Sequence, residues 1–248
     1  MIKASYLNEL EKLLCRKKYI VFLILDALCC LLTAVVQLLT EIFSKGVINT
    51  SSLFDGMLLQ GFSFYLMLFI PLMALMACAD LFSGECQNLS IRMVLLRPAA
   101  RWKIFLSKCL AVYSVCVFYV AAHFIIVFLV KLLLGQTTVG TAYALGAYLF
   151  DLIPVMVIVC FFAFIHQTVR SEGAAVALSV VAYAVILIVG KYVNLANGLV
   201  FTEFLTWHSL WLGVTLPIKV LLPKIGILFG TGVALYCGGY ELFERKDI

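Results

Sequence analysis

Six long blocks of apolar residues constrain the fold of this chain more than any other feature. Four of them have about 20 residues, the length of helix that crosses the ~30 Å hydrocarbon core of a bilayer. The last two are shorter, and the sixth is expected to begin earlier, near Ile218, with Pro223 inside it. We therefore predict an all-α polytopic membrane protein, with one domain over residues 1–248. The blocks are Tyr19–Leu39, Met57–Ala79, Cys109–Val130, Ala144–Ile165, Ala174–Gly190 and Ile225–Tyr240.

Composition excludes several other classes of protein. Hydrophobic residues make up 65% of the 248 residues and charged residues 12%, against about 45–50% and about 25% in soluble domains. This balance excludes a soluble globular enzyme, a disordered chain and a small disulfide scaffold. The first block is too long for the apolar core of a signal peptide, and no A-x-A cleavage site follows it. We expect it to be a retained transmembrane helix.

The distribution of basic residues predicts the orientation. Of the 18 Lys and Arg residues, 12 lie before the first block, in alternate connections after it, or in the tail. Five lie in the remaining connections, and Lys108 stands at the entry to the third block. Because Lys and Arg mark the cytoplasmic side, we predict a multi-pass protein of the plasma (cell) membrane with both termini cytoplasmic. The net charge of +5 is then explained by basic residues on the cytoplasmic side, next to membrane lipid. No nucleic-acid partner is expected.

The nine cysteines do not suggest a disulfide framework or a metal site. All of them fall in predicted helices or on the cytoplasmic side, where thiols stay reduced. No C-x-x-C pair occurs, so no zinc site is expected either. We interpret the cysteines as small apolar packing residues.

Two segments on the cytoplasmic side have apolar stripes of their own. In Met1–Lys18, apolar side chains fall at helical spacing on one face, with Lys3, Glu9, Glu11, Lys12 and Arg16 on the rest. This pattern predicts an amphipathic interfacial helix. The connection Asp80–Lys103 is long for a helix–helix connection and includes a short amphipathic stretch that Pro98 ends. We predict that it forms a cytoplasmic coupling helix that docks a soluble partner; a solvated loop is the alternative.

The external connection Lys191–Lys224 is not hydrophilic, and aromatic and aliphatic residues dominate its middle. Backbone polar groups at membrane depth must be satisfied internally, so we predict an outer re-entrant hydrophobic hairpin. Trp207 and Trp211 suit the outer interface, where one end of the side chain is wet.

The stretch ECQNLSIRMVLLRPAARWKIFLSK, residues 85–108, resembles the type-2 ABC exporter permease family. The family pattern has a glutamate, a Gly-Thr pair, an apolar-basic stretch, Arg-Pro, a small pair, an arginine and a lysine. Leu89 and Ser90 stand where the family has Gly and Thr. The tail LFERKDI also looks like the family's ending. The matching residues are Glu85, Arg97, Pro98, Arg101 and Lys108.

The resemblance implies a six-helix half-transporter with no catalytic residues of its own. A second permease, identical or related, and two cytoplasmic P-loop ATPase subunits would complete it, and the ATPases would bind ATP and Mg²⁺. The chain itself has no G-x-x-x-x-G-K-[ST] loop, since its one Gly-Lys pair, Gly190-Lys191, is followed by Tyr192. The resemblance places the ATPase-docking residues in the coupling segment: Glu85, Arg92, Arg97, Pro98 and Arg101.

Three ionisable residues lie inside the predicted helices: Asp26, His123 and Asp151. Charges at membrane depth are costly and mark functional candidates, so we take these three as candidates for the substrate pathway. The alternative is that each is paired within the bundle or lies near a lipid headgroup. Their scarcity favours an amphiphilic cargo, such as an antimicrobial peptide or drug.

Two other functions remain open from the sequence. An ion-coupled carrier or channel would act without an ATPase, and such folds often show inverted repeats, of which we see no convincing example. A membrane-embedded hydrolase would need a nucleophile and a base at membrane depth. The three histidines lie in three different regions, and neither H-E-x-x-H nor G-x-S-x-G occurs.

Overall fold

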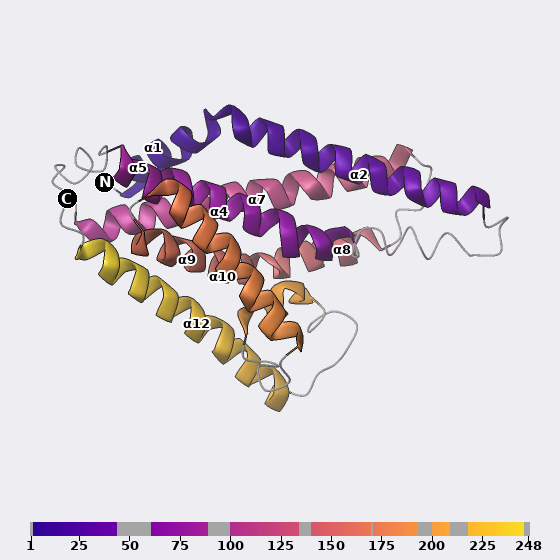
Figure 1. Ribbon diagram of the computed structural model, residues 1–248. Helices are drawn as coiled ribbons and strands as arrows, with labels where there is room; N and C mark the ends of the chain where they lie inside the picture. Colours follow the sequence, from indigo (N-terminus) through magenta and orange to yellow (C-terminus); the bar gives the residue numbers. More distant parts are fainter. Residues whose placement is uncertain are drawn as a thin grey trace.

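The computed structural model is an elongated bundle of helices (Figure 1). The structure describes residues 2–43, 61–88, 100–133, 140–169, 171–192, 200–208 and 218–245, and these contain no strand. The predicted all-α class is confirmed in this part of the chain. The elements are α1 (Ile2–Leu14), α2 (Lys17–Phe43), η1 (Tyr65–Phe69), α4 (Ile70–Cys78), η2 (Ala79–Ser83), α5 (Gly84–Gln87), α7 (Arg101–Leu133), α8 (Thr141–Phe150), α9 (Leu152–Thr168), α10 (Glu172–Tyr192), η4 (Phe201–Thr206) and α12 (Ile218–Glu244).

Six helical stretches are long and apolar enough to cross a membrane, so the chain is a multi-pass membrane protein. Each contains all or most of one predicted block, and α12 begins at Ile218 with Pro223 inside it, as expected. Helix α1 and the last turn of α12 lie at the same end of the bundle (Figure 1). The stretches are Lys17–Val36, Gly61–Gln87, Arg101–Leu133, Thr141–Thr168, Glu172–Gly190 and Leu221–Glu244.

The second and third stretches extend further towards each other than the sequence predicted. The second continues through Gln87, and α7 already begins at Arg101. The predicted coupling segment Asp80–Lys103 therefore begins and ends in helix. The coupling helix itself lies outside the described residues, as do Arg92, Arg97 and Pro98.

The second stretch is not a regular α-helix, because π-helical turns η1 and η2 interrupt it. Pro71 follows η1, and a proline inside a helix leaves the carbonyl four residues earlier without its usual partner. That carbonyl belongs to Met67, and it accepts a hydrogen bond of 2.7 Å from the Tyr183 hydroxyl of α10. A neighbouring helix thus satisfies the backbone group that the proline frees, as membrane helices require.

The fourth stretch is broken where the sequence predicted one continuous helix. Asp151 separates α8 from α9 with a backbone ψ of −8°. Pro154 lies three residues later, where its ring crowds the carbonyl of Phe150, which is four residues before it. The break turns Asp151 into the bundle, and its side chain is fully buried.

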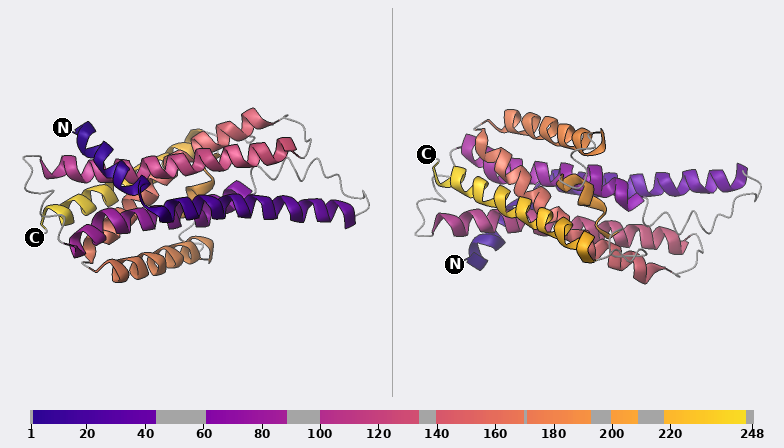
Figure 2. Two further views of the ribbon diagram at one scale, coloured as in Figure 1. Left: turned by 90° about the horizontal axis from the view of Figure 1, so that it is seen from above. Right: turned by 90° about the horizontal axis from the view of Figure 1, so that it is seen from below.

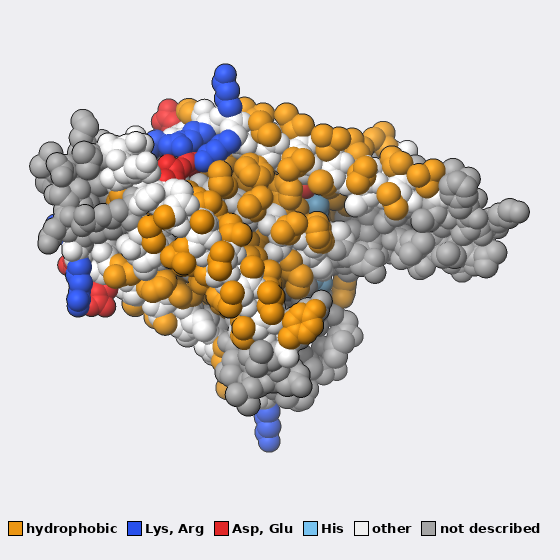
Figure 3. Space-filling view, viewed as in Figure 1, with side chains coloured by type: hydrophobic (Ala, Val, Ile, Leu, Met, Phe, Trp, Pro, Cys, Tyr) orange, Lys and Arg blue, Asp and Glu red, His pale blue; other side chains and the backbone are white. Residues whose placement is uncertain are grey.

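The core is built around α4, α7 and α9, with α12 packed on α9 and α1 packed on α7. Figure 2 shows α1 crossing the end of α7 obliquely and α10 lying along one side. On the face shown in Figure 3, hydrophobic side chains cover the middle of the bundle, and charged side chains gather near α1. Only 6% of the candidate span of α12 is fully buried, so lipid or another chain must cover the rest of its surface in the membrane.

The predicted N-terminal helix forms as α1, and part of its apolar face packs on the bundle. Tyr6, Leu10 and Leu13 pack on the core, while Leu7 and Leu14 are exposed. The prediction is wrong for Glu9, which was placed on the polar face and is buried. Glu9 can be buried because the ammonium groups of Lys12 and Lys108 neutralise its carboxylate.

Of the predicted outer hairpin, the structure describes residues 191–192 at the end of α10, residues 200–208 around the 3-10 helix η4, and residues 218–224 at the start of α12. Trp207 lies inside the bundle with 1% of its side chain exposed. Its ring meets Phe204 edge-on at 5.6 Å, so it does not lie on the outer surface. Trp211 falls outside the described residues.

Candidate functional site

A buried charge network joins α1 to the ends of the second and third spans. The Lys108 ammonium donates to Glu85 Oε2 at 2.7 Å, to Glu9 Oε2 at 3.2 Å and to the carbonyl of Leu81 at 3.0 Å. Lys12 reaches the same two carboxylates, at 2.9 Å from Glu85 Oε1 and 3.1 Å from Glu9 Oε1. Because every carboxylate has two cationic partners, the buried charges are compensated.

Lys12 lies outside the membrane-spanning stretches, and its surroundings favour the charged form. Burial lowers the pKa of the Lys12 ammonium, but the hydrogen bond and charge of Glu85, together with Glu9, outweigh burial. The pKa is therefore raised above its ordinary value of 10.5. Lys12 stays charged throughout the physiological range.

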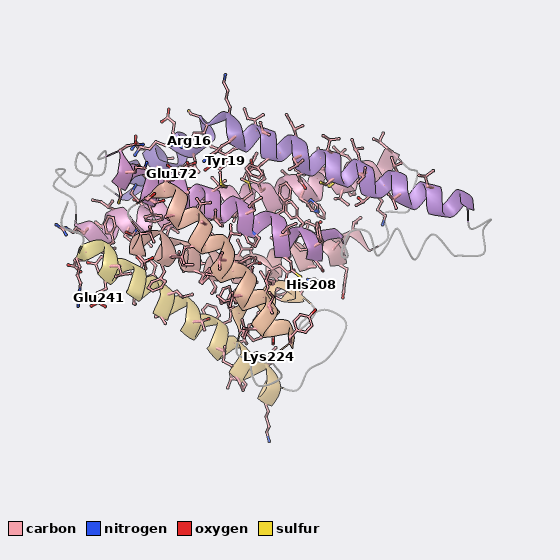
Figure 4. All side chains as sticks on the ribbon, in the orientation of Figure 1. Arg16, Tyr19, Glu172, His208, Lys224 and Glu241 are labelled. Atoms are coloured by element: carbon pink, nitrogen blue, oxygen red, sulfur yellow. The ribbon has the colours of Figure 1, made fainter. Side chains whose placement is uncertain are left out.

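A second group of charges converges on Asp80, which the π-helix η2 carries into the bundle. Arg16 Nη1 and Lys18 Nζ lie 2.5 Å and 2.6 Å from Asp80 Oδ1. The Tyr19 hydroxyl donates to Asp80 Oδ2 at 2.7 Å. Figure 4 shows Arg16 and Tyr19 at the α1 end of the bundle. π-Helical turns often occur at functional sites, and here one fixes the start of α2 to the second span.

Together these contacts make a single unit of α1, the first turn of α2, the end of the second span and the start of α7. The unit flanks residues 89–99, where the sequence predicted the docking helix. Glu85 belongs to the buried side of this unit. Arg101 is exposed at the start of α7, where it donates to the backbone carbonyl of Glu244 at 2.5 Å.

Deeper in the bundle, Asp26 of α2 meets His123 of α7. His123 Nδ1 lies 2.9 Å from Asp26 Oδ1. Cys30, one helical turn after Asp26, places Sγ 3.6 Å from the same nitrogen and 3.9 Å from Asp26 Oδ1. All three side chains are buried, and they offer metal-ligating atoms within 4.8 Å of one another. Asp26 Oδ2 and His123 Nε2 have no hydrogen-bond partner among the described residues.

Asp151 forms a second buried pair, with His208. Its Oδ2 lies 2.6 Å from His208 Nδ1, and its Oδ1 accepts a hydrogen bond of 2.6 Å from the His208 backbone amide. The Asp151 carboxylate therefore holds His208, two residues after η4, against the break between α8 and α9. His208 lies well along the bundle from Arg16 (Figure 4).

Aromatic rings fill the space between the two acid–histidine pairs. Tyr65 stacks on His123 with ring centroids 3.9 Å apart, and Phe62 stacks on Tyr148 at 3.5 Å. Phe62 also lies 6.2 Å from His123 and 6.4 Å from His208. Aromatic rings therefore line both pairs.

The structure pairs each intramembrane candidate with a residue that sequence reasoning did not combine with it. The sequence predicts Asp26 and His123 as separate pathway candidates and Cys30 as a packing residue. The spacing of four residues between Asp26 and Cys30 is a signal that could have linked them, since such residues share a helix face. His208 lies within the predicted outer connection, and no local pattern ties it to Asp151, 57 residues earlier.

A family model described as "Protein of unknown function (DUF2705)" matches residues 42–248. No curated protein matches the chain.

Proposed function

The chain belongs to DUF2705, a family of unknown function, and we propose that it is the membrane-spanning permease subunit of an ATP-driven ABC transporter. It acts with a second permease and with cytoplasmic P-loop ATPase subunits, and it exports an amphiphilic substrate. Six membrane-crossing stretches support a permease. The chain carries no phosphate-binding loop, so the energy enters through another chain.

The observation that carries the proposal is the buried charge network around Lys108. A docking segment can transmit a movement only if its ends are fixed to the transmembrane helices. Glu9, Lys12, Glu85 and Lys108 fix α1, the second span and α7 to one another on both sides of residues 89–99. Closure of the ATPases would then move these elements as one rigid body, the kind of transition by which packed helices switch between two states.

Co-purification in mild detergent from the native membrane tests the proposal. We expect a P-loop ATPase in the eluate, and we expect its loss in the double variant Arg92→Glu, Arg97→Glu, which leaves Glu9, Lys12, Glu85 and Lys108 unchanged. The matched control is Lys219→Glu, an exposed charge at the opposite end of α12 from Arg245. A chain that elutes alone from several detergents and still transports would overturn the proposal.

A proton-coupled carrier is the second candidate. The two buried acid–histidine pairs, Asp26–His123 and Asp151–His208, favour it, because such pairs form proton relays in pumps and transporters. In proteoliposomes that contain this chain alone, uptake driven by a pH gradient would support the carrier. Uptake that requires ATP and an added ATPase would support the permease.

A further inference from the structure

We propose that Asp26, Cys30 and His123 form a binding site for one divalent metal ion of the zinc class, buried between α2 and α7. Their ligand atoms come from two helices that are far apart in the sequence and meet inside the membrane-spanning bundle. The site is independent of the transport function proposed above. The absence of a C-x-x-C pair predicted no metal site, but these ligands are spread over two helices.

The separations of the three ligand atoms fit a tetrahedral ion. Zinc bonds of about 2.0 Å to nitrogen and oxygen and about 2.3 Å to sulfur separate N from O by about 3.3 Å, and S from either by about 3.5 Å. The structure has 2.9 Å between His123 Nδ1 and Asp26 Oδ1, 3.6 Å between Cys30 Sγ and Nδ1, and 3.9 Å between Sγ and Oδ1. Movements of about 0.4 Å or less would complete the triangle around an ion.

The same geometry excludes a catalytic cysteine–histidine–aspartate relay. A relay uses both ring nitrogens, one facing the nucleophile and the other facing the carboxylate. Here Cys30 Sγ and Asp26 Oδ1 both approach His123 Nδ1, while Nε2 has no partner among the described residues. Three ligand atoms around one common point are typical of a metal site. The arrangement therefore does not support the membrane-embedded hydrolase.

Charge balance favours an ion of charge +2. Asp26 is 1% exposed, and its carboxylate has one conventional hydrogen bond and one unpartnered oxygen. A divalent ion bound by this carboxylate, the Cys30 thiolate and a neutral imidazole makes a complex with no net charge, which suits an apolar interior. Binding releases the thiol proton of Cys30, because only the thiolate is a good ligand.

The expected consequence is that the ion fixes α2 to α7. The α2 stretch is mostly exposed along its candidate span, and the three ligands lie beside the Tyr65 ring, which stacks on His123. Three protein ligands leave the fourth tetrahedral position open, as in zinc sites that bind water or a substrate.

Cobalt titration of the full-length chain in detergent tests the site. The purified chain is freed of metal with a chelator, reduced, and titrated with Co²⁺. We expect one Co²⁺ per chain, a thiolate-to-cobalt charge-transfer band, the intense d–d bands of tetrahedral cobalt, and displacement by one equivalent of Zn²⁺. Cys30→Ser should abolish the charge-transfer band and weaken binding by at least about 100-fold, more than the loss of a supporting residue around a metal site.

The matched control is Cys29→Ser, since Cys29 precedes Cys30 on the same helix but is exposed, and it should keep the band. A folded wild-type chain without the band, or a band that survives Cys30→Ser, would overturn the proposal. Zinc-edge X-ray absorption of the wild-type chain gives a test that needs no variant. One sulfur among nitrogen and oxygen ligands supports the site, and a shell with no sulfur or several sulfurs refutes it.

Discussion

Replacing Lys108 with methionine is expected to destabilise the bundle strongly, because this ammonium neutralises two buried carboxylates. The Lys108 side chain is 0% exposed. It donates to Glu85 at 2.7 Å, to Glu9 at 3.2 Å and to the Leu81 carbonyl at 3.0 Å. Methionine keeps most of the side-chain volume but donates no hydrogen bond.

The magnitude follows from what the substitution leaves behind. A hydrogen bond to a charged group contributes about 1.5–3 kcal/mol, but the three bonds do not simply add. Removing one partner of a buried ion pair costs about 3–5 kcal/mol. After Lys108→Met, two carboxylates share Lys12, which is 38% exposed. We therefore expect the free energy of unfolding to fall by about 3–5 kcal/mol.

Unfolding of the purified chain by sodium dodecyl sulfate in mixed micelles, followed by circular dichroism, measures this loss. Lys3→Met, an exposed lysine of α1, is the control and should change stability by about 0.5 kcal/mol or less. A double-mutant cycle with Glu85→Gln should give a coupling energy of about 1–3 kcal/mol. Wild-type stability in Lys108→Met, or zero coupling in the cycle, would refute the reasoning.

Three further outcomes are expected. Gly84→Ala should lower the free energy of unfolding by about 1–3 kcal/mol, because the new Cβ would lie 3.0 Å from the Ala79 carbonyl oxygen. The control Gly173→Ala has open space around its Cβ and should be neutral or stabilising. Equal effects of the two substitutions would contradict the prediction. Because the pKa of Lys12 is raised, its ion pairs stabilise the fold below pH 10.5, and this stabilisation is lost as the pH rises through the raised pKa. When the free energy of unfolding is measured against pH, Lys12→Met should lack this loss of stability. Tyr183→Phe leaves the carbonyl freed by the proline in α4 unpaired and should cost about 1–3 kcal/mol, measured in the same micelle assay; an unchanged stability would argue against that contact.

The unit around Lys108 shows how far sequence reasoning reached into the site. Glu85 and Lys108 were singled out, because they belong to a local stretch with a recognisable pattern. Glu9 was assigned to solvent, since a carboxylate among lysines on a short helix has the pattern of an exposed face. Only the docking of α1 on α7 brings Glu9 to Lys108, 99 residues away in the sequence.

The intramembrane residues give the same lesson at greater depth. Asp26, His123 and Asp151 were predicted as candidates because an ionisable residue in an apolar block is costly wherever it points. The side chain that pairs with each ionisable group depends on which faces of two helices pack against each other. The spacing of Cys30 from Asp26 shows only that the two share a helix face, and His208 carries no local signal for its role. The break at Asp151 becomes visible only in the structure.

The helical class, the six membrane-crossing stretches and the early start of α12 could be predicted from sequence, because bilayer thickness and backbone hydrogen bonding act on each stretch separately. The tertiary structure alone decided the partners of the buried charges and the grouping of Asp26, Cys30 and His123. The Asp26–His123 and Glu9–Lys108 contacts join residues 97 and 99 positions apart, and they exist only once helix faces have packed against one another.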